Sequence, residues 1–362
     1  MALADPPALL TASPTVEING MSYPLIASNL ERMRVTETLG GLSSLELVMT
    51  DGATQNDGSV AHASGAGSPL HLGAGVRVFG GPAEALATEI FDGQITAIEA
   101  EVRESAAPLF TILAEDRLFP LRRKRRTRLF ESMNLSAVVG AIASDHRLKS
   151  EVREGVDTTS RQWMQTDETD LAFLRRILTS LDCDMQVVGD RLQVGRIGMN
   201  QRNAVTLSAG STLRYARITA DVAEQVTAIR VASFDPKAGE AADANEASGG
   251  FGPGRGKSGA DILNEKFSAV VMHLGRYGPM TDADAAAFAK CESNRRARAF
   301  VRCVGTAKGN AELRVGTWVT LAGVNGQFEN DYAVTRAVHR WDQTDGYLTD
   351  FEAECAYLGE AK

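Results

Sequence analysis

Side chains that could carry chemistry are scattered along this chain of 362 residues. The sequence contains no His-Glu-x-x-His, Cys-x-x-Cys or Gly-x-Ser-x-Gly pattern. Such patterns bring metal ligands to one helix face or expose a nucleophile at a sharp turn. We therefore expect no catalytic residue, no metal site and no cofactor. The five histidines are isolated from one another: His62, His71, His146, His273 and His339. Because His339 lies in a strand-like run, we expect it to be packed and hydrogen-bonded.

Gly256-Lys257-Ser258 invites comparison with a phosphate-binding loop. That motif needs a glycine five residues before the second glycine, but Phe251 occupies this position. It also needs a strand before the loop and an apolar helix after it, because this frame aims the backbone N–H groups at phosphate. Neither is evident here, so we interpret the segment as a flexible Gly/Ser linker.

One dense basic run stands out, and it comprises Arg122, Arg123, Lys124, Arg125, Arg126 and Arg128. Such a run can be a solvated connector or a contact for an acidic partner chain. We favour the connector and keep the partner contact as the alternative. Sequence-specific nucleic-acid binding is weakly supported, because only Phe119 and Phe130 lie nearby as stacking platforms.

Composition narrows the class of protein. Lys and Arg number 38 against 46 Asp and Glu, which gives a formal net charge of −8. This acidic balance argues against bulk nucleic-acid binding. The sequence has no apolar run long enough to span a membrane and no basic segment ahead of its first apolar patch, so we expect no signal peptide. Four cysteines without metal spacing predict reduced, mostly buried thiols, as in a protein made in a bacterial cytoplasm.

The pattern of elements indicates an α+β protein that is mainly β. Short alternating runs and turn signals predict a first β domain in residues 1–121 and a second in residues 205–234 and 264–358. Between them, residues 122–204 predict two helices and a β-hairpin, and a further helix begins near Thr281. The apolar face of the second helix is expected to form the core of this insert through Leu171, Phe173, Leu174, Ile177 and Leu178. Residues 235–263 have little to bury, so we expect a flexible loop whose deletion leaves the fold intact.

Two strand-rich blocks look alike. Residues Asp92, Ile95, Thr96, Leu109, Ile112, Ala114 and Glu115 match Asp331, Val334, Thr335, Leu348, Phe351, Ala353 and Glu354 at one constant offset. Gly75 and Gly316 each lead an alternating strand ahead of these blocks. The repeat predicts two copies of one small β-barrel-like domain with the helical segment inserted between them.

At this point the sequence resembles a family. Residues 165–178 are similar to the Q-x-x-E-x-D-x-x-F-L-x-R-L signature of baseplate hub proteins, with Ile177 in place of the final leucine. The hubs concerned are the phage late control protein D family and the N-terminal part of type VI secretion VgrG spike proteins. Residues 91–98, residues 114–118 and the closing strands after Gly316 match the family in the same order. The resemblance covers about residues 16–358.

The resemblance implies a structural baseplate hub without enzymatic activity. Three chains would form a homotrimer whose six similar β domains join a hexameric tail tube protein to a trimeric spike, alongside other baseplate proteins. Because the matched region fills the chain, we expect the spike to be a separate protein. The expected location is the baseplate of a phage tail or of an injection particle, and the sequence does not choose among a phage tail, an extracellular particle and a type VI-like system. Two alternatives stay open: a baseplate-associated cell-wall hydrolase and a nucleic-acid-binding assembly factor.

Overall fold

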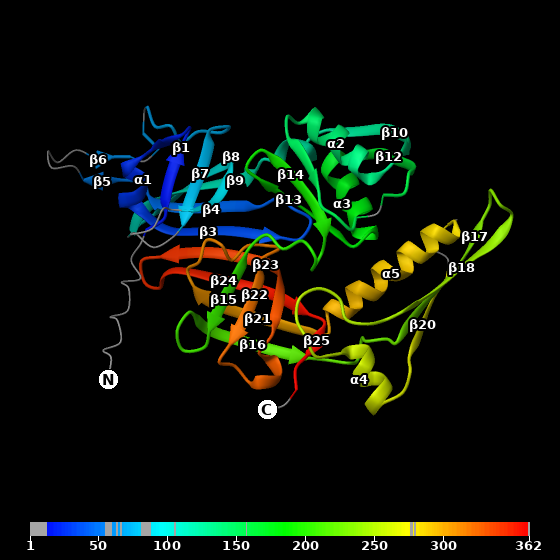
Figure 1. Ribbon diagram of the computed structural model, residues 1–362. Coiled ribbons are helices and arrows are strands. Elements are labelled where there is room, and N and C mark those ends of the chain that lie inside the picture. The colour runs from blue at the N-terminus through cyan, green and yellow to red at the C-terminus, as the bar shows by residue number, and fades with distance from the viewer. Residues whose placement is uncertain are drawn as a thin grey trace.

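The structure is a computed structural model that describes residues 13–54, 60–62, 64–65, 67–80, 88–104, 106–156, 158–275, 278 and 280–360. It is mainly β, as the sequence predicts, and one sheet of 13 strands runs through it (Figure 1). This sheet starts at β16 and ends at β2, so within the described part of the chain it stays open instead of closing into a barrel. None of the described helices has both the length and the apolar character needed to cross a membrane.

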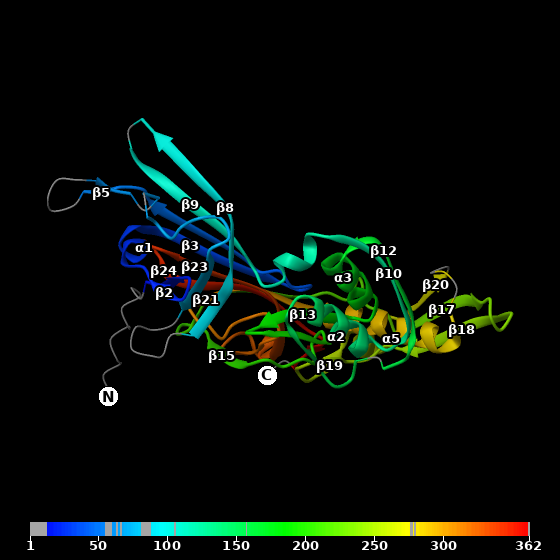
Figure 2. The same ribbon diagram turned by 90° about the horizontal axis from the view of Figure 1, so that it is seen from above.

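A first β unit holds the N-terminal strands. Its elements are β1 (Thr15–Ile18), β2 (Met21–Ser22), α1 (Pro24–Asn29), β3 (Leu30–Thr38), β4 (Ser44–Thr50), β5 (Ala53–Thr54), β6 (Val60–Ala61), β7 (Gly75–Gly80), β8 (Thr88–Arg103) and β9 (Ala106–Asp116). Asn19 and Gly20 both have positive φ between β1 and β2, which is the backbone that an Asn-Gly hairpin turn requires. The β8–β9 hairpin extends away from the rest of the sheet (Figure 2).

The insert follows and has its own core. Its elements are η1 (Phe119–Arg122), β10 (Arg125–Met133), α2 (Leu135–Asp145), β11 (Lys149–Val152), β12 (Arg161–Thr169), α3 (Asp170–Ser180), β13 (Cys183–Val188) and β14 (Arg191–Arg196). The side chain of Asn134 caps α2, and that of Thr169 caps α3. Thr169 is also the last residue of β12, which pairs with β10, so the helix begins where this strand ends. All five side chains expected in the insert core are buried.

A second β unit completes the large sheet. Its elements are β15 (Ala204–Ser208), β16 (Leu213–Ala220), β21 (Val301–Lys308), β22 (Trp318–Ala322), η2 (Gly326–Phe328), β23 (Asp331–Asp342), β24 (Gly346–Cys355) and β25 (Tyr357–Leu358). Its core contains Tyr332 and Phe300, both almost completely buried.

Between β16 and β21 the chain leaves the large sheet and forms an arm, residues 228–298, seen at the right of Figure 1. The arm contains β17 (Ala228–Asp235), β18 (Glu240–Ala247), β19 (Lys257–Ser258), α4 (Gly259–Lys266), β20 (Val271–Gly275) and α5 (Asp282–Arg298). Strand β17 pairs with both β18 and β20, and α5 packs against this three-stranded sheet.

The expectation of a flexible loop at residues 235–263 is therefore wrong. This stretch contains β18 and the start of α4, and Ala242 is buried. Composition alone could not predict β18, because this strand needs few apolar side chains: its partner β17 and helix α5 supply them. Deleting this stretch would remove a paired strand, so the deletion is expected to disturb the fold.

The repeat extends to the pairing of individual residues. In the first unit Ile95 on β8 faces Ala114 on β9, and in the second unit Val334 on β23 faces Ala353 on β24. Both equivalences span 239 positions (95 to 334, and 114 to 353). The two hairpins also share an irregularity, because the pairing shifts directly after Ile95 in one and directly after Val334 in the other.

The neighbouring strands repeat in the same way. Strands β3 and β4 pair as β16 and β21 do, with Val35 opposite Leu45 in one unit and Ile218 opposite Cys303 in the other. The pairing of β3 with β4 shifts after Leu30, and that of β16 with β21 shifts after its equivalent, Leu213. Four strands of each unit thus share their register and the bulges described above, so the two units are structural repeats.

One detail of the expected repeat needs correction. On β7, Gly75 faces Gln94, and the equivalent position on β23, Ala333, faces Trp318. Gly75 therefore corresponds to Trp318 and not to Gly316. A displacement of two residues keeps the same side chains on the same face of a strand, so sequence alternation could not detect it.

The two units join edge to edge within the chain. Strand β23 continues beyond its partner β22 and pairs with β3, so that His339 faces Val35 and Trp341 faces Met33. Trp341 and Tyr347 of the second unit are part of the hydrophobic core of the first. This strand pairing, the intrachain junction, merges the two sheets into one.

Candidate functional site

The most enclosed polar cluster lies beside the intrachain junction. Glu37 on β3 is buried, and Arg314 reaches it from the loop before β22, donating from Nε to Oε1 over 2.6 Å. The Val315 N–H donates to Oε2 of the same carboxylate at 3.3 Å. Burial alone would raise the pKa of Glu37, but Arg314 holds it below its ordinary value. The pair is therefore charged, and it ties the two β units together.

His339 completes this cluster. It is fully buried, and its Nδ1 lies 2.8 Å from the Tyr347 hydroxyl. Burial, with the charge of Arg314 nearby, lowers the pKa of His339 to about 4. The side chain is therefore neutral at pH 7 and is packed and hydrogen-bonded, as the sequence predicts.

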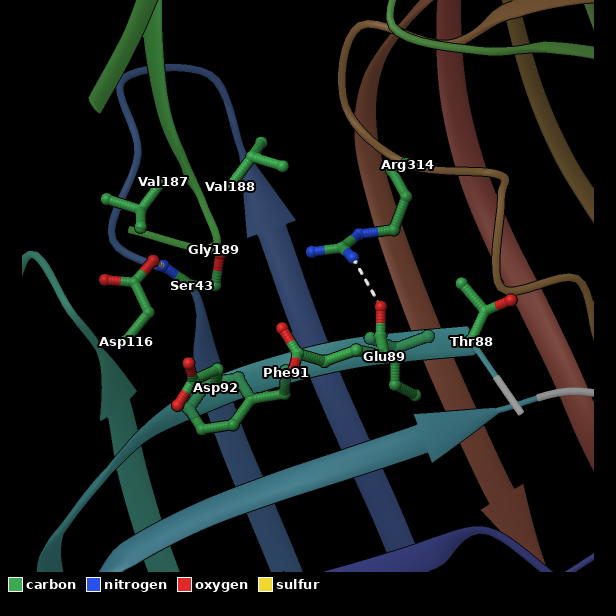
Figure 3. Close-up of a pocket in the computed structure, with 11 residues that line it drawn as sticks. Ser43, Thr88, Glu89, Phe91, Asp92, Asp116, Val187, Val188, Gly189 and Arg314 are labelled. Carbon is green, nitrogen blue, oxygen red and sulfur yellow. Dashed lines mark hydrogen bonds between the residues drawn. The ribbon is translucent and has the colours of Figure 1, made fainter. Parts of the chain in front are cut away.

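A cavity of about 240 Å³ opens where the first unit, the insert and the second unit meet (Figure 3). Its lining includes Thr88 to Asp92 of β8, the hairpin tip at Val187 to Gly189, and Arg314. Arg314 donates from Nη1 to the Glu89 carbonyl at 3.0 Å across one side of it.

Burial raises the pKa of Asp116, which lines this cavity, to about 6. A perturbed carboxyl in a cavity is a general candidate for acid–base chemistry. Here both oxygens already accept backbone N–H groups, from Ser43 at 2.7 Å and from Leu118 at 2.8 Å. The other two carboxylates of the lining are paired as well, Glu89 with Arg77 and Asp92 with Arg117. The cavity therefore lies where three units meet, and each carboxylate of its lining is already hydrogen-bonded or ion-paired. These groups offer no free acid–base pair.

The motif of residues 165–178 forms a second polar cluster, inside the insert. Asp170 is buried at the start of α3. Its carboxylate is hydrogen-bonded to Gln165 Nε2 at 2.9 Å, Arg128 Nη2 at 2.5 Å and His146 Nε2 at 2.8 Å. Burial would raise the pKa of Asp170, but these hydrogen bonds and charges hold it below its ordinary value. The motif residues thus position one another and link β10, α2, β12 and α3.

The basic run is largely neutralised by this chain. Arg122 pairs with Glu115, Arg125 with Asp167, and Arg126 and Arg128 both with Asp145. Arg123 lies over the ring of Phe119. Lys124 has no ion pair within the described part of the chain. These contacts leave little free positive charge for nucleic acid, and contact with an acidic partner stays a prediction.

Gly256-Lys257-Ser258 does not form a phosphate cradle. Ser258 caps α4, and Asp261 of the same capping box accepts the Ser258 N–H at 2.9 Å. Lys257 Nζ lies 2.6 Å from Glu265. The Asp261 carboxylate lies at this helix start and would repel a bound anion. The segment therefore caps the helix and does not bind phosphate. It is structured, contrary to the expected linker.

No metal or thiol site emerges among the described residues. No group of three or more His, Cys, Asp or Glu side chains is arranged to hold an ion. All four cysteines are free thiols; Cys183, Cys303 and Cys355 are buried and Cys291 is half-buried. Burial raises the pKa of both Cys303 and Cys355 to about 12, which keeps them protonated and unreactive.

The ion pair of Glu37 with Arg314 was not predicted from the sequence, where its partners lie 277 positions apart. The sequence does contain one sign of a buried charge at Glu37. Met33, Val35 and Glu37 alternate on β3 and share its buried face, so a carboxylate occupies a position that alternation reserves for an apolar side chain. A buried charge of this kind requires a partner, although the sequence does not say which.

Comparison with solved structures defines the class of fold. Over 95% of its length the chain superposes on 98% of the 43 kDa tail protein of prophage MuSo2 from Shewanella oneidensis, with a TM-score of 0.69 and 14% identity. A tail protein from Neisseria meningitidis MC58 matches with a TM-score of 0.65 and 11% identity over 94% of this chain and 96% of that one. The Escherichia coli c3393 protein, described as a type VI secretion component similar to T4 tail proteins gp27 and gp5, matches at 0.62 and 13% over 96% and 79%. The chain has the fold of phage tail proteins and VgrG-like proteins.

The family follows from sequence. The chain belongs to the family described as the Alg8 N-terminal domain, whose sequence model matches residues 10–343. That description names a domain and no reaction. No curated protein matches the chain by sequence.

Proposed function

We propose that the chain is the structural hub of a baseplate, a trimeric adaptor between a hexameric inner tube and a trimeric spike. The observation that carries the proposal is the repeat of four strands with the same register and the same bulges. A chain with two equivalent β units matches a six-fold object when three copies assemble, and it still presents three-fold symmetry to a spike. Sheath contraction would then drive tube, hub and spike outward together.

The proposal extends to the relatives, the location and the partners of the hub. The hub would be related to the phage late control protein D family and to the N-terminal part of VgrG, and it would sit in the baseplate of a virion tail or an injection particle. Its partners would be the tube protein, a separate spike protein and other baseplate proteins.

We also propose that residues 1–121, residues 122–204 and residues 205–234 with 264–358 act as separate domains. Three hydrophobic cores that largely follow these bounds support the division, although Trp341 and Tyr347 of the second unit pack into the core of the first. The corrected segment at residues 235–263 would belong with the arm, whose own small core lies between α5 and its sheet.

A test is co-expression of the chain with a tail tube protein from the same genome, followed by mass measurement of the purified complex. We expect three hub chains with six tube subunits. A complex with equal numbers of the two chains would overturn the adaptor. Clearing of a cell-wall zymogram by the purified chain would favour the hydrolase instead.

A further inference from the structure

Two strand segments of the 13-stranded sheet have a partner on one side only, one in β8 within the sheet path and one in β16 at its end. On β8, residues 97–103 pair with β9 on one side only, because β7 ends its pairing at Gln94. Every side chain from Ile98 to Arg103 is exposed, and Val102 is 86% exposed. At the end of the sheet path, β16 pairs with β21 alone. Figure 2 shows β8 extending freely with β9, and Figure 1 shows β16 along the lower margin of the sheet.

The repeat gives each segment a counterpart that is already paired. Residues 97–101 of β8 correspond in register to residues 336–340 of β23, which lie in the intrachain junction. After Glu101 the pairing of β8 with β9 shifts, but the extra residue lies on β9, so the alternation of β8 continues to Arg103 as that of β23 does to Asp342. Strand β16 corresponds to β3, the other half of that junction. The intrachain junction is therefore a template for a contact that one chain cannot make with itself.

We propose that β8 of one copy pairs antiparallel with β16 of a second copy, in the register of the intrachain junction. His339 faces Val35 within the chain, so Ala100 would face Ile218 of the second copy. The same transfer sets Glu101 opposite Arg217 and Val102 opposite Ala216.

The side chains that this register brings together are compatible. On one face the pairs are Ile98 with Ala220, Ala100 with Ile218, and Val102 with Ala216, all of them apolar. On the other face the pairs are Glu99 with Thr219, Glu101 with Arg217, and Arg103 with Tyr215. A slip of one residue would place apolar side chains opposite charged ones, so the pattern selects this register over its neighbours.

The charged pair is available for the contact. Glu101 is exposed and bonds only to Arg103 on the same strand, with Nε to Oε1 at 2.9 Å. Arg217 is exposed and has no ion pair within the described part of the chain. Opposite charges directly across a strand pair favour pairing, whereas like charges oppose it.

The new contact differs from its template in one way. Glu37 and His339, which lie at the core of the intrachain junction, correspond to Ala220 and Ala100. The contact between copies therefore lacks the buried ion pair that Arg314 provides within the chain. It would form reversibly on assembly, and it would cover two strand edges that are otherwise prone to non-specific pairing.

That three copies close into a ring rests on the proposed function. The pairing of β8 with β16 does not. The contact is heterologous, so its geometry sets how many copies close the ring. A ring of three chains would contain one such junction within each chain and one between each pair of neighbours, which makes six similar junctions.

The test is thiol cross-linking at about 100 μM protein, with each variant mixed in its native buffer and oxidised mildly. The pair Glu101→Cys with Arg217→Cys should cross-link between chains, because directly opposed side chains bring their Cβ atoms to roughly 4.5–5.5 Å. Two matched controls, Glu101→Cys with Thr219→Cys and Glu101→Cys with Tyr215→Cys, displace the partner by two residues on the same face. We expect at least tenfold less product from each control. Each single variant should give only background.

A second arm uses charge. Arg217→Glu should abolish association measured by sedimentation, and Glu101→Arg combined with Arg217→Glu should restore it. The outcomes separate the two proposals. A ladder that stops at three chains supports both. Cross-linked chains that never stop at three support the pairing and contradict the trimeric hub. Trimers without the 101–217 product, or a chain that stays monomeric and uncross-linked, overturn the pairing.

Discussion

At the scale of single residues, the buried Glu37–Arg314 ion pair links the two β units. Removing one partner of a buried ion pair leaves the other charge unpaired, which costs about 3–5 kcal/mol. We expect Glu37→Gln to lower the free energy of unfolding by that order, measured by urea denaturation at pH 7. Glu46→Gln is the matched control, because Glu46 pairs with Arg32 at the surface and such pairs contribute about 0–1 kcal/mol. Equal effects of the two substitutions would mean that the junction does not depend on this pair.

The buried histidine at the same junction makes stability depend on pH. Between pH 6.5 and about 4 the unfolded chain protonates His339 while the folded chain does not, so stability is lost as pH falls through this range. Asp116 acts in the opposite direction, because its pKa is raised from 3.8 to about 6 and the folded chain binds the extra proton. The two effects partly cancel in the intact protein, which makes a variant necessary to separate them.

We expect His339→Gln to remove about 2–3 kcal/mol of the difference in unfolding free energy between pH 7 and pH 4.5. Exposed His71→Gln serves as the control and should keep the dependence of the intact protein. An unchanged pH dependence in His339→Gln would show that the pKa of this histidine is the same in the folded and unfolded chain.

At the scale of elements, helix α3 contributes its buried apolar face to the core of the insert. Phe173 is completely buried on this helix, and its ring stacks on Phe130 of β10 with centroids 5.7 Å apart. Truncating a buried phenylalanine costs about 3–5 kcal/mol, so we expect Phe173→Ala to unfold the insert or prevent assembly. Met164→Ala is the control in the same insert, because that side chain is 52% exposed. Melting of Phe173→Ala at the same temperature as the unsubstituted protein would mean that this face contributes no packing.

Local signals explain which elements could be predicted from the sequence. The Asn19-Gly20 hairpin, the caps Asn134 and Thr281, and the apolar face of α3 depend on nearby residues, and all are present in the structure. Strand β18 was missed because its stability comes from partners elsewhere in the chain. The Glu37–Arg314 pair was missed for the same reason, since only the folded sheet brings these positions together.

At the scale of the whole molecule, the repeat places two equivalent β units in one chain, and β23 of the second unit pairs with β3 of the first. In the proposed hub, the counterparts of these two strands, β8 and β16, would make the equivalent contact between chains. The sequence revealed the repeat through a constant offset. It could not reveal that the units fuse into one sheet, because the pairing of β23 with β3 leaves no local pattern.

The most direct test of the hub is cryo-microscopy of the assembled particle. We predict three copies of this chain in one ring, with the two β units of each chain occupying alternate positions of a quasi-six-fold layer against the tube. A trimeric spike should sit on the opposite side. Six copies of the chain in that ring, or a ring in which only one of the two β units faces the tube, would contradict the account.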